Sequence, residues 1–144
     1  MLTILTPYHP RFVHFPIALS LVGVLFIALG LIRHRERWIG FGQFSLFLGW
    51  LGVIAAIVTG LIDQSRAPDD AVVKAVINQH ITAGIALLIA VGLALYWPLR
   101  NKRLLSDGRA AWGYLALLLI IAALVFVEGW LGGKLVYQLG VGVK

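Results

Sequence analysis

Residues 12–32, FVHFPIALSLVGVLFIALGLI, decide the fold, because these 21 consecutive residues include no Asp, Glu, Lys or Arg. At about 1.5 Å of rise per residue, a helix of this length crosses a hydrocarbon core of about 30 Å. Three similar apolar stretches follow, at about residues 39–62, 75–99 and 110–133. The sequence therefore predicts an all-α, integral membrane four-helix bundle that forms a single domain over residues 1–144.

The composition agrees with a bilayer environment. Hydrophobic residues make up 60% of the chain and charged residues 12%, whereas soluble domains carry about 25% charged residues. The chain has no cysteine, which excludes disulfides, thiolate metal sites, iron–sulfur ligation and thioether-linked haem. Any cofactor must be held by nitrogen ligands, oxygen ligands or packing.

The basic residues predict the orientation. The connections at residues 33–37 and 100–109 carry seven Lys or Arg and a net charge of +5, and the rest of the chain carries five and a net charge of +1. Short basic loops remain in the cytoplasm, so both termini are expected on the periplasmic side. The net charge of +6 is then explained by the basic loops on one side of the membrane, where anionic lipid headgroups lie, and it does not indicate binding to nucleic acid.

Two histidines are expected at one depth. The interval from His14 to Arg33 is only one position shorter than the interval from His80 to Arg100. Each imidazole would therefore stand roughly 29 to 30 Å from the basic loop that follows. The interval between the two histidines likewise differs by only one position from that between the two arginines, which suggests a parallel internal repeat. Its axis would make His14 and His80 face each other across the bundle.

Two acids accompany this layer. Glu128 follows Arg109 by the same interval that separates His14 from Arg33, which returns it to the depth of the two histidines. The interval from Arg37 to Asp63 is longer, so Asp63 should lie a helical turn or more higher. Acids at this boundary either reach water or need a partner inside the bundle. We expect Glu128 and Asp63 to tune whatever the histidines hold, and the alternative is that they are ordinary interfacial residues.

The occupant that the sequence favours is one b-type haem with His14 and His80 as the two axial ligands of its iron. Ala18 and Gly84 follow these histidines by four residues and would leave clearance for a flat macrocycle, although close helix packing also selects small residues. The predicted role is electron transfer near the outer face, between a quinone or a membrane oxidoreductase and an external redox protein.

Alternatives remain open. A divalent metal, zinc or copper, could be held by His14 and His80 with His9 as an accessory ligand and Glu128 or Asp63 as an oxygen ligand. The same residues could handle protons, or they could only fix helix register in a structural or assembly subunit without a cofactor. No hydrolytic or transferase motif is present, so an enzyme role would be at most that of a cytochrome-like redox subunit.

Local signals predict helix boundaries near the outer end. Asp69 and Asp70 precede an apolar run and would cap the third span, and Gly132-Gly133 would end the fourth. The apolar tail at residues 135–143 is too short to cross a bilayer. It is expected to pack on the outer surface.

Several segments together resemble the bacterial membrane family known as domain of unknown function 2231, and the resemblance covers essentially the whole chain. They are His9-Pro10-Arg11-Phe12-Val13-His14-Phe15-Pro16-Ile17-Ala18-Leu19, Thr59-Gly60-Leu61-Ile62-Asp63, His80, Gly132-Gly133-Lys134-Leu135-Val136-Tyr137 and Gly140-Val141-Gly142-Val143. The resemblance implies a four-span protein of the bacterial inner membrane. Members of that family also occur fused to Rieske-type iron–sulfur domains, so a Rieske-type or other periplasmic redox partner is implied. A homodimer is compatible with the sequence.

Overall fold

The structure is a computed structural model that describes residues 9–142, apart from 66, 102–103 and 105–107. Its elements are α1 (His9–Phe12), α2 (His14–Ile32), α3 (Glu36–Gln64), α4 (Ala71–Arg100), α5 (Gly108–Gly133) and η1 (Lys134–Gln138), a short π-helical turn. The described part of the chain contains no strand. Four helices are long and apolar enough to cross a membrane. The all-α, four-helix prediction is confirmed, and the membrane side of the termini stays a prediction.

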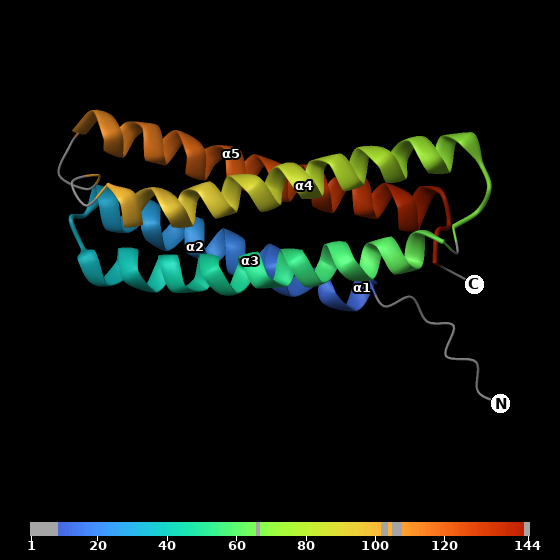
Figure 1. Ribbon diagram of the computed structural model, residues 1–144, viewed down its shortest axis with the longest axis horizontal. Coiled ribbons are helices and arrows are strands. Elements are labelled where there is room, and N and C mark those ends of the chain that lie inside the picture. The colour runs from blue at the N-terminus through green and yellow to red at the C-terminus, as the bar shows by residue number, and fades with distance from the viewer. Residues whose placement is uncertain (1–8, 66, 102–103, 105–107, 143–144) are drawn as a thin grey trace.

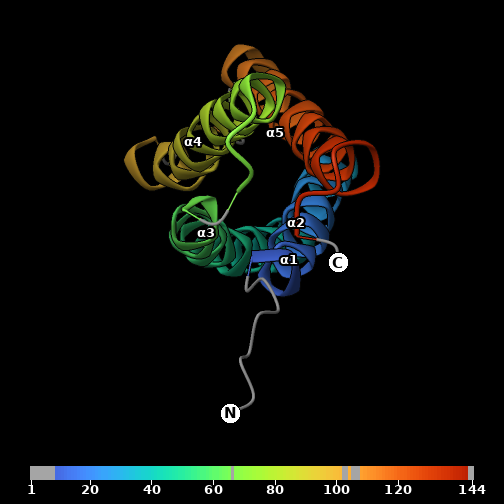
Figure 2. The same ribbon diagram turned by 90° about the vertical axis from the view of Figure 1, so that its right-hand side faces the viewer.

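The four long helices form an antiparallel bundle, seen from the side in Figure 1 and from one end in Figure 2. Each packs against two neighbours: α2 lies between α3 and α5, and α4 lies between α3 and α5. We call the end that holds His9 and His80 the histidine end, and the opposite end, with residues 33–37, the arginine end.

Glycines allow α2 and α3 to approach closely. A Cβ placed on Gly42 would lie 2.7 Å from the backbone nitrogen of Ile27, and one on Gly23 would lie 2.9 Å from the backbone nitrogen of Leu46. Close approach of backbones through small residues is the usual way in which membrane helices associate. This contact fixes the rotation of α2 and therefore decides which of its residues face the interior.

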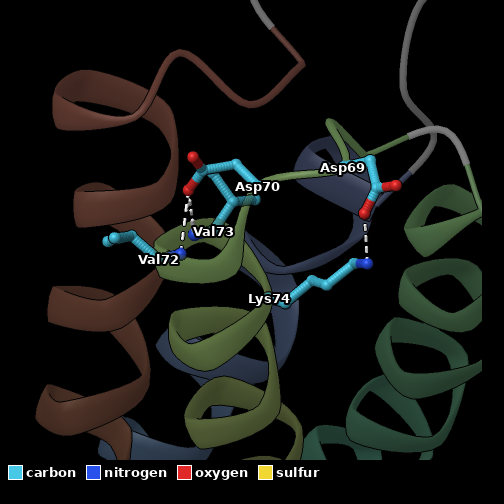
Figure 3. A network of polar contacts seen from close by, with 5 residues as sticks. All are labelled: Asp69, Asp70, Val72, Val73 and Lys74. Carbon is cyan, nitrogen blue, oxygen red and sulfur yellow. Dashed lines mark hydrogen bonds and ion pairs between the residues drawn. The ribbon is translucent and has the colours of Figure 1, made fainter.

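The third span begins as predicted. Asp70 is the N-cap of α4, and its carboxylate accepts hydrogen bonds from the backbone nitrogens of Val72 and Val73 at 2.8 and 3.0 Å (Figure 3). These bonds satisfy two of the backbone donors that a helix start leaves free. The expected helix end is also confirmed, since α5 ends at Gly133.

The interior is packed most fully in the middle of the bundle and toward the arginine end. Ile27, Leu46, Val91 and Tyr114 are fully buried there. A second cluster lies at the histidine end, where residues 135–142 pack over the bundle and Leu135 is buried. Many large apolar side chains point outward, as expected of a surface in contact with lipid: Phe15, Leu25, Phe44, Ile89, Leu119 and Phe126.

Candidate functional site

The histidine end brings together the imidazoles of His9 and His80. Their Nε2 atoms are 3.5 Å apart, and their ring planes meet at 82° with ring centroids 5.7 Å apart. His9 belongs to the short helix at the start of the chain, and His80 lies ten residues into α4 counting from Ala71 as the first. The two histidines are 71 positions apart in the sequence, and their Nε2 atoms point toward each other.

Helix α1 positions His9. Pro10 lies in its first turn, where a missing backbone N–H costs little. The backbone nitrogen of Val13 donates to the carbonyl of His9, and that of Ile17 donates to the carbonyl of Val13, both at 3.3 Å. Helix α1 therefore leads almost directly into α2, and His9 lies on the inward face of the joined helices.

Helix α3 holds the ring and the backbone of His9. Nδ1 of His9 is 2.8 Å from the carbonyl oxygen of Ala56, and the backbone nitrogen of His9 donates to Oδ2 of Asp63 at 2.8 Å. A carbonyl oxygen only accepts hydrogen bonds, so Nδ1 must carry the ring proton. The Nε2 atom of a neutral His9 is then left with a lone pair directed at His80.

Glu128 of α5 lies against the other side of His80. Its Oε2 atom is 2.9 Å from Nδ1 of His80, and the two side chains are 13% and 16% exposed. The Nδ1–H direction is not aligned with the oxygen closely enough for a hydrogen bond, so this is a close polar contact that becomes an ion pair only when His80 is protonated. A carboxylate this close favours the proton on Nδ1, which also leaves Nε2 of His80 with a lone pair.

The electrostatics of His9 favour its neutral form. Burial lowers the pKa of His9 below its ordinary value of 6.5, the hydrogen bond to the Ala56 carbonyl raises it, and the positive charge of a protonated His80 lowers it further. The net direction is downward. A neutral imidazole at this position presents an unprotonated Nε2, which is the form that binds a metal ion.

A cavity of about 160 Å³ adjoins the two histidines. The polar side chains of its wall are those of His9, Asp63, Gln64, His80 and Glu128, and the remaining wall is mainly aliphatic. Residues that line it include Val53 and Ile57 of α3, Ile77, Ile81 and Leu87 of α4, and Leu135 of the tail. The site is therefore a small apolar chamber with a polar cluster at one wall.

The expected pairing of His14 with His80 does not occur. His14 is exposed, and its Nδ1 lies 3.0 Å from the carbonyl oxygen of Pro10. The inward face of α2 begins at Pro16, and two residues of an α-helix correspond to about 200° of rotation. His14 therefore points away from the bundle, and Ala18, one turn further along, is exposed on the same outward face.

The other predicted residues do meet at this end. Gly84 is buried and lines the cavity beside Glu128, where an added Cβ would lie 3.8 Å from Oε1. Asp63 also lines the cavity and holds the backbone of His9. His9 occupies the position that was expected for His14, although the sequence predicted only an accessory role for it.

A spacing in the sequence could have identified His9. Seven residues make almost two helical turns, so positions seven apart share a face. This interval joins His9 to three buried residues of α2: Pro16, Gly23 and Gly30. His9 lies before the apolar stretch of residues 12–32, so the spacing was not followed back to it.

The pair is suited to binding a single cation between two nitrogen ligands. Two unprotonated nitrogens repel each other at 3.5 Å unless a proton or a metal ion lies between them. Within the described ranges, no three His, Asp or Glu side chains are grouped so that they could hold a metal ion. A metal ion here would therefore take its remaining ligands from outside this histidine pair.

The family model described as "Predicted membrane protein (DUF2231)" matches residues 5–144. No curated protein and no solved structure matches the chain. The match thus extends over both histidines, both acids and the tail.

Proposed function

The chain belongs to the DUF2231 family of predicted membrane proteins, and from that premise we propose that it is a metal-binding membrane protein. The proposed centre is a single zinc or copper ion between Nε2 of His9 and Nε2 of His80. The observation that carries the proposal is the 3.5 Å approach of these two atoms, each on a ring whose other nitrogen already has an acceptor beside it.

The separation of the nitrogens suits a metal ion. A zinc–imidazole bond is about 2.0–2.1 Å long, so two such bonds at the tetrahedral angle place their nitrogens about 3.3–3.4 Å apart. The observed 3.5 Å differs from this value by little more than a tenth of an ångström. The ring centroids are 5.7 Å apart, so the two Nε2 atoms aim almost straight at one another. Each ring would therefore have to turn by about 35° to direct both lone pairs at one tetrahedral ion.

The surroundings of the two rings also suit metal ligands. A metal-bound histidine almost always donates its other ring N–H to a carboxylate or a backbone carbonyl, which fixes the tautomer and the orientation of the ring. Glu128 is the carboxylate beside His80, and Ala56 is the carbonyl beside His9. The carbonyl of Ala56 already accepts from His9, and the carboxylate of Glu128 lies 2.9 Å from Nδ1 of His80, where a turn of the ring would align the N–H with it.

An ion with only two protein ligands would keep open positions toward the cavity. Metal sites with open positions bind water or a substrate, whereas purely structural zinc sites are closed by four protein ligands. We therefore propose a centre that binds or activates a small ligand. We also propose that the histidine end lies on the periplasmic side of the bacterial inner membrane, because the basic connections at residues 33–37 and 100–109 lie at the other end.

A b-type haem remains a prediction, and the geometry favours it less than a metal ion. A cavity of about 150 Å³ holds a single benzene ring, and the cavity beside the histidines measures about 160 Å³. A porphyrin carries several such rings in one plane. His14, the second expected axial ligand, points away from His80.

The test is metal analysis of the full chain purified in detergent from cells grown with zinc and copper. We expect about one zinc or copper ion per chain in the wild type and in His14→Ala. We expect its loss in His9→Ala and in His80→Ala. His14→Ala is a matched control because it removes an imidazole only five residues from His9 without altering the cavity.

Optical spectra of the same samples address the haem. A Soret band that disappears in His14→Ala and His80→Ala would support the haem and contradict the metal proposal. A protein without stoichiometric metal, or with metal that survives both His9→Ala and His80→Ala, would overturn the proposed centre.

A further inference from the structure

The cavity has the size of one aromatic ring. Its volume of about 160 Å³ is close to the roughly 150 Å³ that suffices for benzene in an aliphatic protein cavity. Ile57, Ile77, Ile81 and Leu87 supply walls without polar side-chain atoms. A ligand here must therefore be compact and mostly apolar.

One wall of the cavity offers a hydrogen-bond acceptor. Oε1 of Glu128 is buried and receives no hydrogen bond from any residue that the structure describes. Its partner atom Oε2 faces His80, whereas Oε1 lies beside Gly84, where an added Cβ would still be 3.8 Å away. A buried carboxylate oxygen without a donor is costly, so a ligand hydroxyl that meets Oε1 after a small turn of the Glu128 side chain would be strongly favoured over a saturated chain.

The cavity reaches the surface beside the end of α3. Leu61 and Gln64, near the end of α3, line the cavity and are themselves exposed. Because this opening lies on the flank of an apolar bundle, a membrane-dissolved molecule can reach it sideways.

We infer that the cavity binds the hydroxylated aromatic ring of a membrane-soluble molecule, the chemical class to which quinol head groups belong, with its hydroxyl donating to Oε1 of Glu128. This inference goes beyond the proposed metal centre and does not depend on it, because it rests on the cavity and on Glu128. The ring would fill the aliphatic chamber, and any tail would leave past Leu61 and Gln64.

A matched pair of small probes tests the inference on the full chain in detergent. 4-Methylphenol and toluene have nearly the same shape and differ by one hydroxyl. We expect 4-methylphenol to bind at least tenfold more tightly than toluene, as measured by ligand-observed NMR, because only the phenol satisfies Glu128. The measurement is made on chelator-treated protein and on zinc-loaded protein, so that a failure of the metal proposal leaves this result interpretable.

Two variants locate the probe. Gly84→Leu should fill the cavity and weaken binding of 4-methylphenol at least tenfold. Gly129→Leu is the matched control, because an added Cβ there meets no atom within 4 Å, and it should bind the probe as the wild type does.

Three results would overturn the inference. They are equal binding of the two probes by the wild type, unchanged binding of 4-methylphenol by a folded Gly84→Leu, and no saturable binding of either probe. The last result would mean that the chamber holds only water or lipid chains. The wild-type comparison needs no substitution, so it decides the matter even if Gly84→Leu does not fold.

Discussion

The rotation of one helix decides which histidine can act. His9 and His14 are five residues apart. Five residues of a helix correspond to about 500° of rotation, so the two side chains point in directions roughly 140° apart around the helix axis. The close packing of Gly23 and Gly42 turns the Pro16 face of α2 inward. His9 then lies beside His80, and His14 is left on the outside.

Glu128 gives a prediction at the residue scale. Glu128→Ala removes the carboxylate that orients His80, and loss of such a partner typically lowers metal affinity by roughly 10- to 100-fold. Competition with a fluorescent zinc chelator measures the change. Glu36→Ala is the control, since Glu36 is exposed at the arginine end, and zinc affinity that is equal in the two variants would contradict the role given to Glu128.

Only some of the residues that form the site could be predicted from the sequence. Residue counts placed His80 and Glu128 at one depth, and the structure brings them together. Counting gives height along a helix but not direction around it. The choice between His9 and His14 therefore depended on which face of α2 packs against α3, and only the seven-residue spacing from His9 to Pro16 carried that information.

The contact between α2 and α3 gives a prediction at the element scale. Gly42→Ala would force its Cβ to within 2.7 Å of the Ile27 backbone, and such overpacking usually lowers the free energy of unfolding by about 1–3 kcal/mol. Gly40→Ala is the matched control on the same helix, since nothing lies within 4 Å of its Cβ. Unfolding in mixed detergent should show Gly42→Ala clearly less stable than Gly40→Ala, and equal stabilities would contradict the close packing.

The start of α4 gives a second prediction at this scale. Asp70→Ala removes two hydrogen bonds to the first turn (Figure 3) and should lower the free energy of unfolding by about 1 kcal/mol. Asp69 instead contacts the side chain of Lys74 at the surface, where an ion pair contributes at most about 1 kcal/mol. Asp69→Ala should therefore be the milder change, and the reverse order would contradict the cap.

The elements themselves followed from simple signals. Long apolar stretches must form helices in a bilayer because every backbone polar group needs an internal partner. The acidic cap at Asp70 and the glycines at the end of α5 then fixed two boundaries. The helical turn before α2 was not anticipated: the first apolar stretch begins at residue 12, whereas α1 begins at His9, with Pro10 in its first turn.

At the scale of the whole molecule, the bundle has two different ends. The arginine end is joined by a short exposed basic turn, and the histidine end holds the cavity under the tail. The packing of the tail could be anticipated from its apolar sequence. The cavity could not, because its lining comes from several helices and the tail, and the way in which these elements fit together has no local sequence signal.

The orientation is a prediction that belongs to this scale. The natural chain has no cysteine, so single cysteines can be placed at each end and labelled in intact cells with a membrane-impermeant maleimide. We expect Asp69→Cys to be labelled from outside and His34→Cys only after the cells are opened, because the short basic turns remain in the cytoplasm. Labelling in the opposite pattern would show that the protein has the opposite orientation, with the site at the cytoplasmic face.

The most direct test of the proposed centre is the ¹⁵N NMR spectrum of the histidine side chains during a zinc titration. The chain has four histidines, and the signals of His9 and His80 are identified by their loss in His9→Ala and His80→Ala. We predict that zinc shifts Nε2 of these two rings to metal-bound values, leaves their Nδ1 atoms protonated and leaves His14 and His34 unchanged. A shift of His14, or no shift of any imidazole at one equivalent of zinc, would contradict the account.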